Sequence, residues 1–122
     1  MYIRSAAMFH HSLHVDQRTF GPGDTVEGTV RLALLSSTEP VTVELRAVDL
    51  IHGTKCYRRP LAHKELAARV GEHAFALSIP LDALEREDIP RDEPVSDTGF
   101  EISLRVGRVG VASLSVSLIG GR

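Results

Sequence analysis

Apolar and polar residues alternate with a period of two along most of this chain, and no other feature restricts its possible folds so strongly. One side of the run "TVEGTVRLALL" is formed by Val26, Gly28, Val30, Leu32 and Leu34. Successive side chains leave opposite faces of a β-strand, so the alternation predicts a strand with one buried and one solvated face. A glycine on the buried face is typical of close packing against another segment.

Similar alternation recurs in the runs "SLHV", "EHAFALSI", "GFEISLRV" and "ASLSVSLI". In "VTVELRAVDLI" (Val41–Ile51) the apolar positions change side near Arg46 and Ala47, which predicts a β-bulge or a strand that changes sheets there. A weaker strand is expected within Ala62–Val70. Glycine- and proline-rich segments separate the runs, as turns between strands require.

These strands predict an all-β fold, an immunoglobulin-like antiparallel β-sandwich of about seven strands. No long segment has helical periodicity, and we expect at most one short helix, near residues 81–88. Residues 85–99 are rich in acidic residues and proline, which favours a solvated crossover connection of the kind that Greek-key sandwiches need.

The length of 122 residues suits one domain, residues 1–122, with residues 1–8 as a peripheral arm or extra strand. Fourteen Lys and Arg against 16 Asp and Glu give a net charge of −2, which argues against nucleic-acid binding through bulk charge. The single cysteine, Cys56, excludes an internal disulfide. No apolar run has the length of a signal peptide or a membrane span, so a cytoplasmic location is expected.

The glycine-rich stretch "FGPGDTVEGTV" predicts a turn between a strand ending at Phe20 and one starting at Thr25. Pro22 fixes φ at the second position of a type II turn, and Gly23 supplies the positive φ of the third position. The alternative, a phosphate-binding loop, needs backbone amides aimed at an anion and usually a helix behind them. Here a strand follows and Pro22 removes one amide, so the turn is favoured.

Four segments, taken in order, resemble those of arrestin-like domains. "FGPGDTVEGTVRL" resembles the early strand pair with its "PGD-x-V-x-G-x-V" segment, and "VTVELRAVDLIHGTK" looks like the strand after it. "VGEHAFALSIPLD" is similar to a "G-x-H-x-F-x-F-x-x-x-P" strand, and "GFEISLRVGRV" to the strand that follows. The residues that carry the likeness of the third segment are Gly71, His73, Phe75, Leu77 and Pro80. The resemblance covers Leu13 to Ile119.

The resemblance implies an immunoglobulin-like sandwich used for protein–protein interaction, as in arrestins, retromer-type relatives and bacterial sporulation-control proteins. Arrestins have two such lobes, whereas this chain has room for one. Ser103 and Leu104 stand where many relatives have an aromatic residue. Receptor regulation is therefore not carried over to this chain, and the fold and a general binding role are what the resemblance supports.

Three histidines, His10, His11 and His14, form the cluster most suggestive of a metal site. On a strand, residues four apart lie about 13 Å from each other, so one ion cannot bind both His10 and His14. Solvated or cross-strand histidines are favoured, and we expect no metal and no cofactor. Cys56 has cationic neighbours, which can activate a thiol, but no positioned base is evident. No catalytic residue is assigned, and the protein is not expected to be an enzyme.

The segment from Lys55 to Lys64 carries four cations and no acid. It is either a solvated loop or edge strand, or a patch that binds an anionic protein partner, and Lys55, Arg58 and Arg59 are the candidate partner-binding residues. We expect a non-enzymatic interaction module that binds a partner through an open sheet edge or end loops. Self-association through sheet edges is a further expectation. The alternative is a small-ligand or carbohydrate-binding accessory sandwich, which the scarcity of aromatic residues disfavours.

Overall fold

The computed structural model describes residues 11–33, 39–83 and 97–119, and nearly all of them belong to eight β-strands. The strands are β1 (Ser12–Val15), β2 (Thr19–Phe20), β3 (Thr25–Leu32), β4 (Val41–Ile51), β5 (Thr54–Leu66), β6 (Gly71–Ser78), β7 (Asp97–Val106) and β8 (Val109–Leu118). The expected all-β fold is confirmed. The described part does not include the expected arm at residues 1–8. It also leaves out residues 84–88 of the expected short helix and residues 85–96 of the expected crossover.

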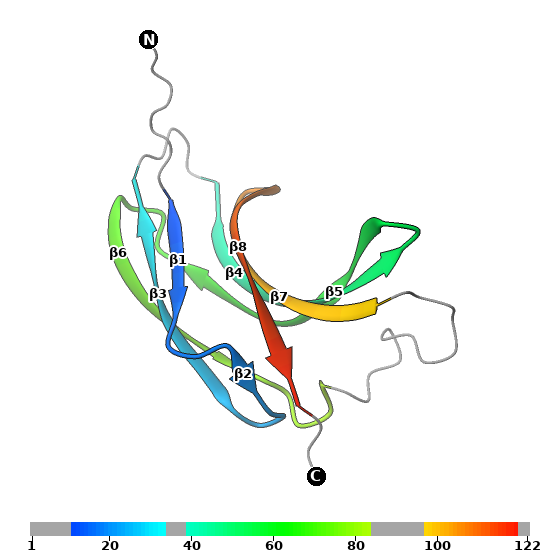
Figure 1. Ribbon diagram of the computed structural model, residues 1–122. Helices are drawn as coiled ribbons and strands as arrows, with labels where there is room; N and C mark the ends of the chain where they lie inside the picture. Colours follow the sequence, from blue (N-terminus) through cyan, green and yellow to red (C-terminus); the bar gives the residue numbers. More distant parts are fainter. Residues whose placement is uncertain (1–10, 34–38, 84–96, 120–122) are drawn as a thin grey trace.

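The strands form two sheets that pack face to face (Figure 1). One sheet has three strands in the order β1-β3-β6, and the other has five in the order β2-β8-β7-β4-β5. All pairs are antiparallel except β2 and β8, which run parallel over Thr19–Phe20. The expected sandwich is therefore mostly, but not purely, antiparallel.

The core lies between the sheets and follows the alternation of the sequence. On β3 every second residue is buried, as on β1, and β6 follows the same alternation from Phe75 onward. The largest fully buried apolar side chains come from both sheets and are Phe20, Leu32, Leu45, Leu77, Ile102 and Leu104. Burial of these side chains is the main stabilising contribution, because it removes apolar surface from water.

The turn that precedes β3 has the predicted geometry. Gly23 has φ of 89°, and the amide of Asp24 donates to the carbonyl of Gly21 at 3.1 Å. The Asp24 carboxylate accepts a further hydrogen bond from the Gly21 amide at 2.8 Å. The strands on either side, β2 and β3, belong to different sheets and do not pair with each other. The turn therefore carries the chain from one layer of the sandwich to the other, which the sequence did not indicate.

The irregularity expected near Arg46 and Ala47 is present, but the extra residues lie on the partner strand. The pairing of β4 with β7 is continuous, whereas its pairing with β5 shifts on both sides of Arg46. Leu45 faces Ala62 and Arg46 faces Pro60, which leaves Leu61 as an extra residue of β5. Bulges bend a strand and increase its twist. In Figure 1 the β4–β5 hairpin stands apart from the start of β8, and β4 and β7 curve between them.

Candidate functional site

The three cations predicted to bind a partner, Lys55, Arg58 and Arg59, all lie on β5 close to its hairpin with β4. They are therefore on one edge of the five-stranded sheet, as the expectation of an edge strand requires. However, the structure pairs two of them with acidic side chains of the neighbouring strands. Most of the charge that the sequence suggested for a partner is compensated within the protein.

Lys55 forms an ion pair across the outer face of the sheet with Glu101 of β7. Its ammonium lies 2.7 Å from one carboxylate oxygen, and the hydroxyl of Tyr57 donates to the other oxygen at 3.3 Å. The Glu101 side chain is only 7% exposed, so the two donors replace the water that its charge would otherwise bind. The hydrogen bond and the charge of Glu101 raise the pKa of Lys55 above its usual value of 10.5.

Arg58 is directed by the irregular part of β5 toward Asp49 of β4. Its Nε lies 2.5 Å from a carboxylate oxygen of Asp49, whose side chain is fully buried. The carbonyl of Arg58 in turn accepts a hydrogen bond from Arg46 at 2.8 Å. Arg59, which is exposed, also has an interaction partner. The bulged segment is thus held by polar contacts at both its side chain and its backbone.

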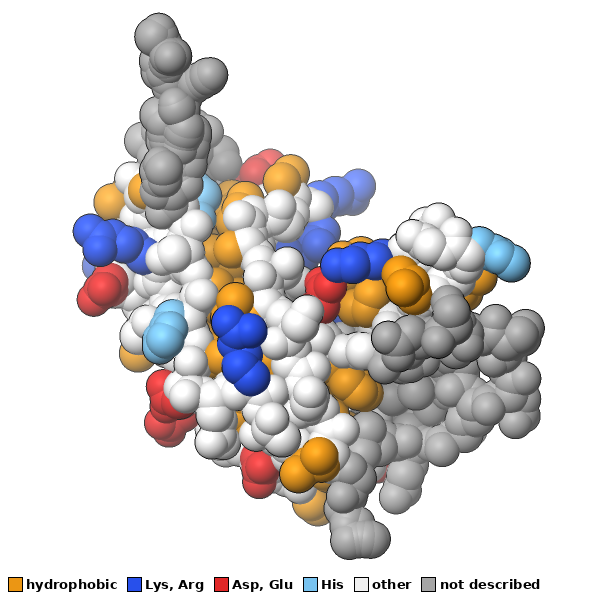
Figure 2. Space-filling view, in the orientation of Figure 1, with side chains coloured by type: hydrophobic (Ala, Val, Ile, Leu, Met, Phe, Trp, Pro, Cys, Tyr) orange, Lys and Arg blue, Asp and Glu red, His pale blue; other side chains and the backbone are white. Residues whose placement is uncertain are grey.

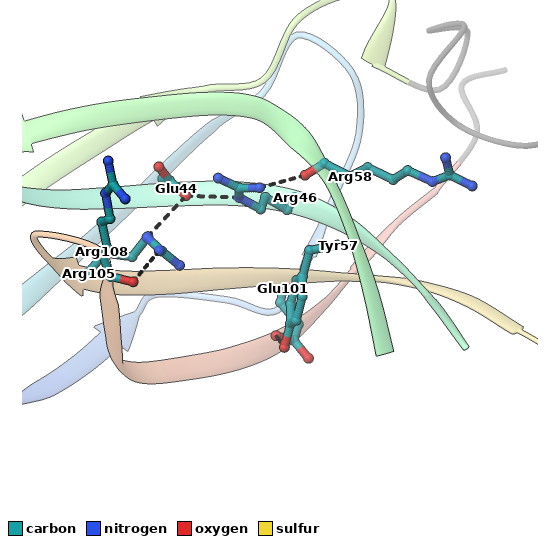
Figure 3. A network of polar contacts seen from close by, with 7 residues as sticks. All are labelled: Glu44, Arg46, Tyr57, Arg58, Glu101, Arg105 and Arg108. Atoms are coloured by element: carbon teal, nitrogen blue, oxygen red, sulfur yellow. Dashed lines mark hydrogen bonds and ion pairs between the residues drawn. The ribbon is translucent and has the colours of Figure 1, made fainter. Parts of the chain in front are cut away.

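A second polar cluster lies on the outer face of the same sheet, centred on Glu44 of β4 (Figure 3). Arg46 Nε lies 2.9 Å and Arg105 Nε 3.9 Å from the same oxygen of Glu44. Arg105 also donates to the carbonyl of Arg108 at 2.6 Å, in the turn between β7 and β8. The register explains this meeting. Arg46 is two residues after Glu44 on β4, and Arg105 is two residues after Ser103, which faces Glu44 on β7. All three charged side chains therefore lie on the outer face of the sheet.

The outer face of the five-stranded sheet is hollowed in two adjoining places. The larger hollow has a volume of about 530 Å³ and is lined by Arg46, Tyr57, Ser103, Arg105, Gly110, Val111, Ala112 and Ser113. The smaller, of about 220 Å³, is lined by Lys55 and Glu101 and by apolar residues that include Val48 and Val116. In Figure 2 the β4–β5 hairpin projects as a separate lobe beside this concave region, and basic and acidic side chains lie next to each other on the visible face.

Sequence reasoning missed Glu44, Arg46 and Arg105. A signal was present, since each is a charged residue at a polar position within a predicted strand. Their meeting was not readable, because it depends on β4 and β7 being adjacent and on their register. The predicted set was drawn instead from one contiguous basic segment.

The other residues singled out in the sequence do not come together. His11 accepts a hydrogen bond from the amide of Ala33 at 3.2 Å, His14 is exposed, and His10 lies outside the described residues. Within residues 11–33, 39–83 and 97–119, no three histidine, cysteine or acidic side chains are grouped as metal ligands would be. Cys56 is exposed, and its thiol lies 3.9 Å from the carbonyl oxygen of Thr54.

No helix among the described residues is long and apolar enough to cross a bilayer.

Comparisons with known proteins identify no family for this chain. No family model and no curated protein matches it. Among solved structures, a β-glucosidase from Listeria innocua in complex with gluconolactone aligns with 92% of this chain at 14% identity and a TM-score of 0.47. An alkylpurine DNA glycosylase from Pseudomonas fluorescens, bound to DNA with an abasic-site analogue, aligns with 88% at 15% identity and the same TM-score. The chain spans only 16% and 29% of these two proteins, and at such TM-scores neither likeness indicates a function.

Proposed function

We propose that this protein is a non-enzymatic, arrestin-like interaction module that binds an extended segment of a protein partner along the free edge of β5. The observation that carries the proposal is the position of this strand. It has 13 residues, ends the five-stranded sheet, and pairs with β4 alone among the described strands. A row of unpaired backbone donors and acceptors at a sheet edge is a template for strand addition. The resemblance of the sequence to arrestin-like domains supports the same role.

The register indicates which backbone groups of β5 face the open edge. The amide of Gly107 donates to the carbonyl of Pro40 at 2.8 Å, so the backbone N–H and C=O groups of even-numbered β4 residues point toward β7. These groups alternate in direction along a strand, so the N–H and C=O of odd-numbered β4 residues such as Val43 point toward β5, where Lys64 is the partner of Val43. On β5 the next residue, His63, therefore directs its N–H and C=O away from the sheet.

Two features of β5 limit what can pair with it. Pro60 lacks an N–H, and the bulges around it interrupt the ladder, so the edge is divided into Thr54–Tyr57 and Leu61–Leu66. Lys64 and Glu65 add charges to the second stretch. Such devices protect natural edge strands from open-ended aggregation. These features restrict an added segment to about six residues beside Leu61–Leu66. β6 of the other sheet lies near the same stretch, since Lys64 and Ala74–Ala76 line one surface hollow.

The proposal is tested with a substitution that prevents strand addition and a matched control that removes the same side chain but leaves the backbone able to pair. In His63→Pro the outward N–H is lost, and proline is tolerated on edge strands at such positions. His63→Ala is the matched control, because it removes the same side chain and keeps the N–H. Each protein is immobilised and exposed to a lysate of its native cells, and the captured proteins are compared quantitatively by mass spectrometry. We expect at least one protein to be retained by wild type and His63→Ala and lost from His63→Pro.

Thermal unfolding is measured for all three proteins to establish that each is folded. If His63→Pro is unfolded, Glu65→Pro is used in its place. Light scattering after size-exclusion chromatography identifies a second copy of this chain as the occupant if a wild-type dimer is lost in the proline variant. Capture and self-association that do not distinguish His63→Pro from His63→Ala would overturn the proposal.

A further inference from the structure

The hollow on the outer face of the five-stranded sheet contains more positive than negative charge. Two guanidinium groups, those of Arg46 and Arg105, approach one carboxylate, that of Glu44. Each arginine uses its Nε toward Glu44 and one terminal nitrogen toward a backbone carbonyl, of Arg58 or Arg108. The cluster of Arg46, Arg105 and Glu44 therefore keeps an excess of one positive charge, and both guanidinium groups are held in fixed orientations (Figure 3).

One terminal nitrogen of each arginine, Nη2 of Arg46 and Nη1 of Arg105, has no hydrogen-bond partner within residues 11–33, 39–83 and 97–119. Nη1 of Arg105 lies beside Gly110, 4.0 Å from the position that a Cβ would take there, and Gly110 lines the hollow. The side chains of both arginines are about one-quarter to one-third exposed. Donors that are oriented but not used within the protein are available to a ligand.

We propose that this hollow binds a small organic hydroxy acid, with its carboxylate on Arg46 and Arg105. The unused terminal nitrogens, Nη2 of Arg46 and Nη1 of Arg105, can each donate one charge-assisted hydrogen bond to a carboxylate, and the excess of one charge matches a single carboxylate. Ser103 and Ser113 line the hollow beside the arginines and supply hydroxyl groups for the hydroxyls of the ligand. The volume of about 530 Å³ is in the range of small-molecule sites.

The position of the hollow favours a small molecule over a protein segment bound at the β5 edge. Neighbouring strands lie about 4.8 Å apart, and a segment added beyond β5 is three spacings, about 14 Å, from β7. Arg105 is on β7, so the backbone of such a segment lies far from the strand that carries this arginine. Binding in the hollow and strand addition at β5 are therefore separate properties, and either can hold without the other.

The whole chain has a net charge of −2, so it does not attract anions non-specifically. Binding of an anion would therefore indicate a specific site. This allows a simple test with two probes that differ in one group. Glucuronate carries a carboxylate where glucose has a hydroxymethyl group. We expect isothermal titration calorimetry of the full chain to detect glucuronate binding and no glucose binding.

The variants Arg46→Gln and Arg105→Gln are each expected to weaken glucuronate binding about tenfold, because each removes one charge-assisted contact. Arg31→Gln is the matched control. It removes the same charge from β3, in the other sheet, where Arg31 is exposed, and it is expected to leave the affinity unchanged. Thermal unfolding of each variant accompanies the titration.

A second measurement does not depend on the variants. In nuclear magnetic resonance spectra of the wild-type protein, glucuronate is expected to shift the amide signals of Ser103, Gly110 and Ser113 and to leave those of β3 in place. The absence of glucuronate binding would overturn the proposal, as would equal binding of glucose or an equal loss of affinity in Arg31→Gln. Tighter binding of inorganic phosphate, or binding of hexaglutamate in place of glucuronate, would identify a different ligand class and equally overturn it.

Discussion

Arg58 Nε lies 2.5 Å from a carboxylate oxygen of Asp49, and the Asp49 side chain is fully buried although it sits on an otherwise apolar face of β4. A buried carboxylate is costly unless its charge is compensated. The irregular register of β5 places the Arg58 side chain where it can provide this compensation. A cation that the sequence suggested for a partner thus contributes to the fold itself.

The first prediction concerns this pair. Arg58→Met is expected to lower the free energy of unfolding by about 1–3 kcal/mol, since it removes a charged hydrogen-bond partner of a buried group. In a double-mutant cycle with Asp49→Asn, the two changes are expected to cost less together than the sum of their separate costs, by about 0.5–3 kcal/mol. Urea unfolding measures each term. Arg31→Met, at an exposed position of β3, serves as the control and is expected to stay within about 0.5 kcal/mol of wild type. Additive effects would show that the pair is not coupled.

The second prediction concerns the close approach of β1 and β6 to β3 at Gly28. A Cβ there would overlap the carbonyl oxygen of His14 and would lie 2.8 Å from Cζ of Phe75. Gly28→Ala is therefore expected to lower the free energy of unfolding by about 1–3 kcal/mol through overpacking. Gly99→Ala is the control, because a Cβ on Gly99 meets no atom within 4 Å. Calorimetric unfolding compares the two, and equal melting temperatures would contradict the close packing.

The third prediction concerns the turn between β2 and β3. Gly23 has φ of 89°, which L-residues with branched side chains rarely adopt, and a Cβ there would lie 2.8 Å from Leu81. Gly23→Val is expected to cost about 1–3 kcal/mol of stability. At Gly21, two positions earlier, a Cβ would make only ordinary contacts at 3.8 and 3.9 Å, so Gly21→Ala is the control. Chemical denaturation distinguishes them, and an unchanged stability of Gly23→Val would refute the turn geometry.

The fourth prediction follows from the raised pKa of Lys55. The pKa of the folded state lies above the ordinary value of 10.5, chiefly because Glu101 accepts a hydrogen bond from the ammonium. The pair therefore stabilises the protein fully below pH 10.5, and the contribution is lost as the pH rises through the pKa of the folded state. Wild type is expected to melt above Lys55→Gln at neutral pH, and the gap is expected to close in strongly alkaline buffer.

The control for this pH series is Lys64→Gln, on the same strand, because Lys64 forms no ion pair with the described residues. Its melting temperature is expected to differ little from that of wild type at neutral pH. A gap between wild type and Lys55→Gln that persists unchanged at alkaline pH would show that the stabilisation comes from packing of the Lys55 side chain and not from its charge.

Local patterns were sufficient for most strands, since alternation reports directly which side chains share a face. The inward residues Val26, Val30 and Leu32 of β3 are buried as predicted, and the turn at Gly23 follows from the residue types alone. The position of the irregularity in β4 was also predicted. That its extra residues belong to β5 was not, because a bulge is a property of two paired strands and the partner was unknown.

The candidate binding residues show the same division more clearly. The sequence grouped Lys55, Arg58 and Arg59 because they are close in the chain, and their contact with a partner stays a prediction. It could not show that Lys55 and Arg58 have acidic partners on β7 and β4. Charge compensation depends on which strands are neighbours, and neighbours in a sheet are set by long-range contacts.

The sequence by itself determined that this chain forms an all-β fold, which faces of its strands are buried, and where Pro22 and Gly23 turn the chain. These are local consequences of side-chain alternation and backbone sterics. Only the tertiary structure decided that β2 joins β8 in parallel, that β5 is left as an open edge, and that Arg46 and Arg105 meet at Glu44. Those outcomes depend on strand order and register, which are set by how the two sheets pack together and not by any one segment.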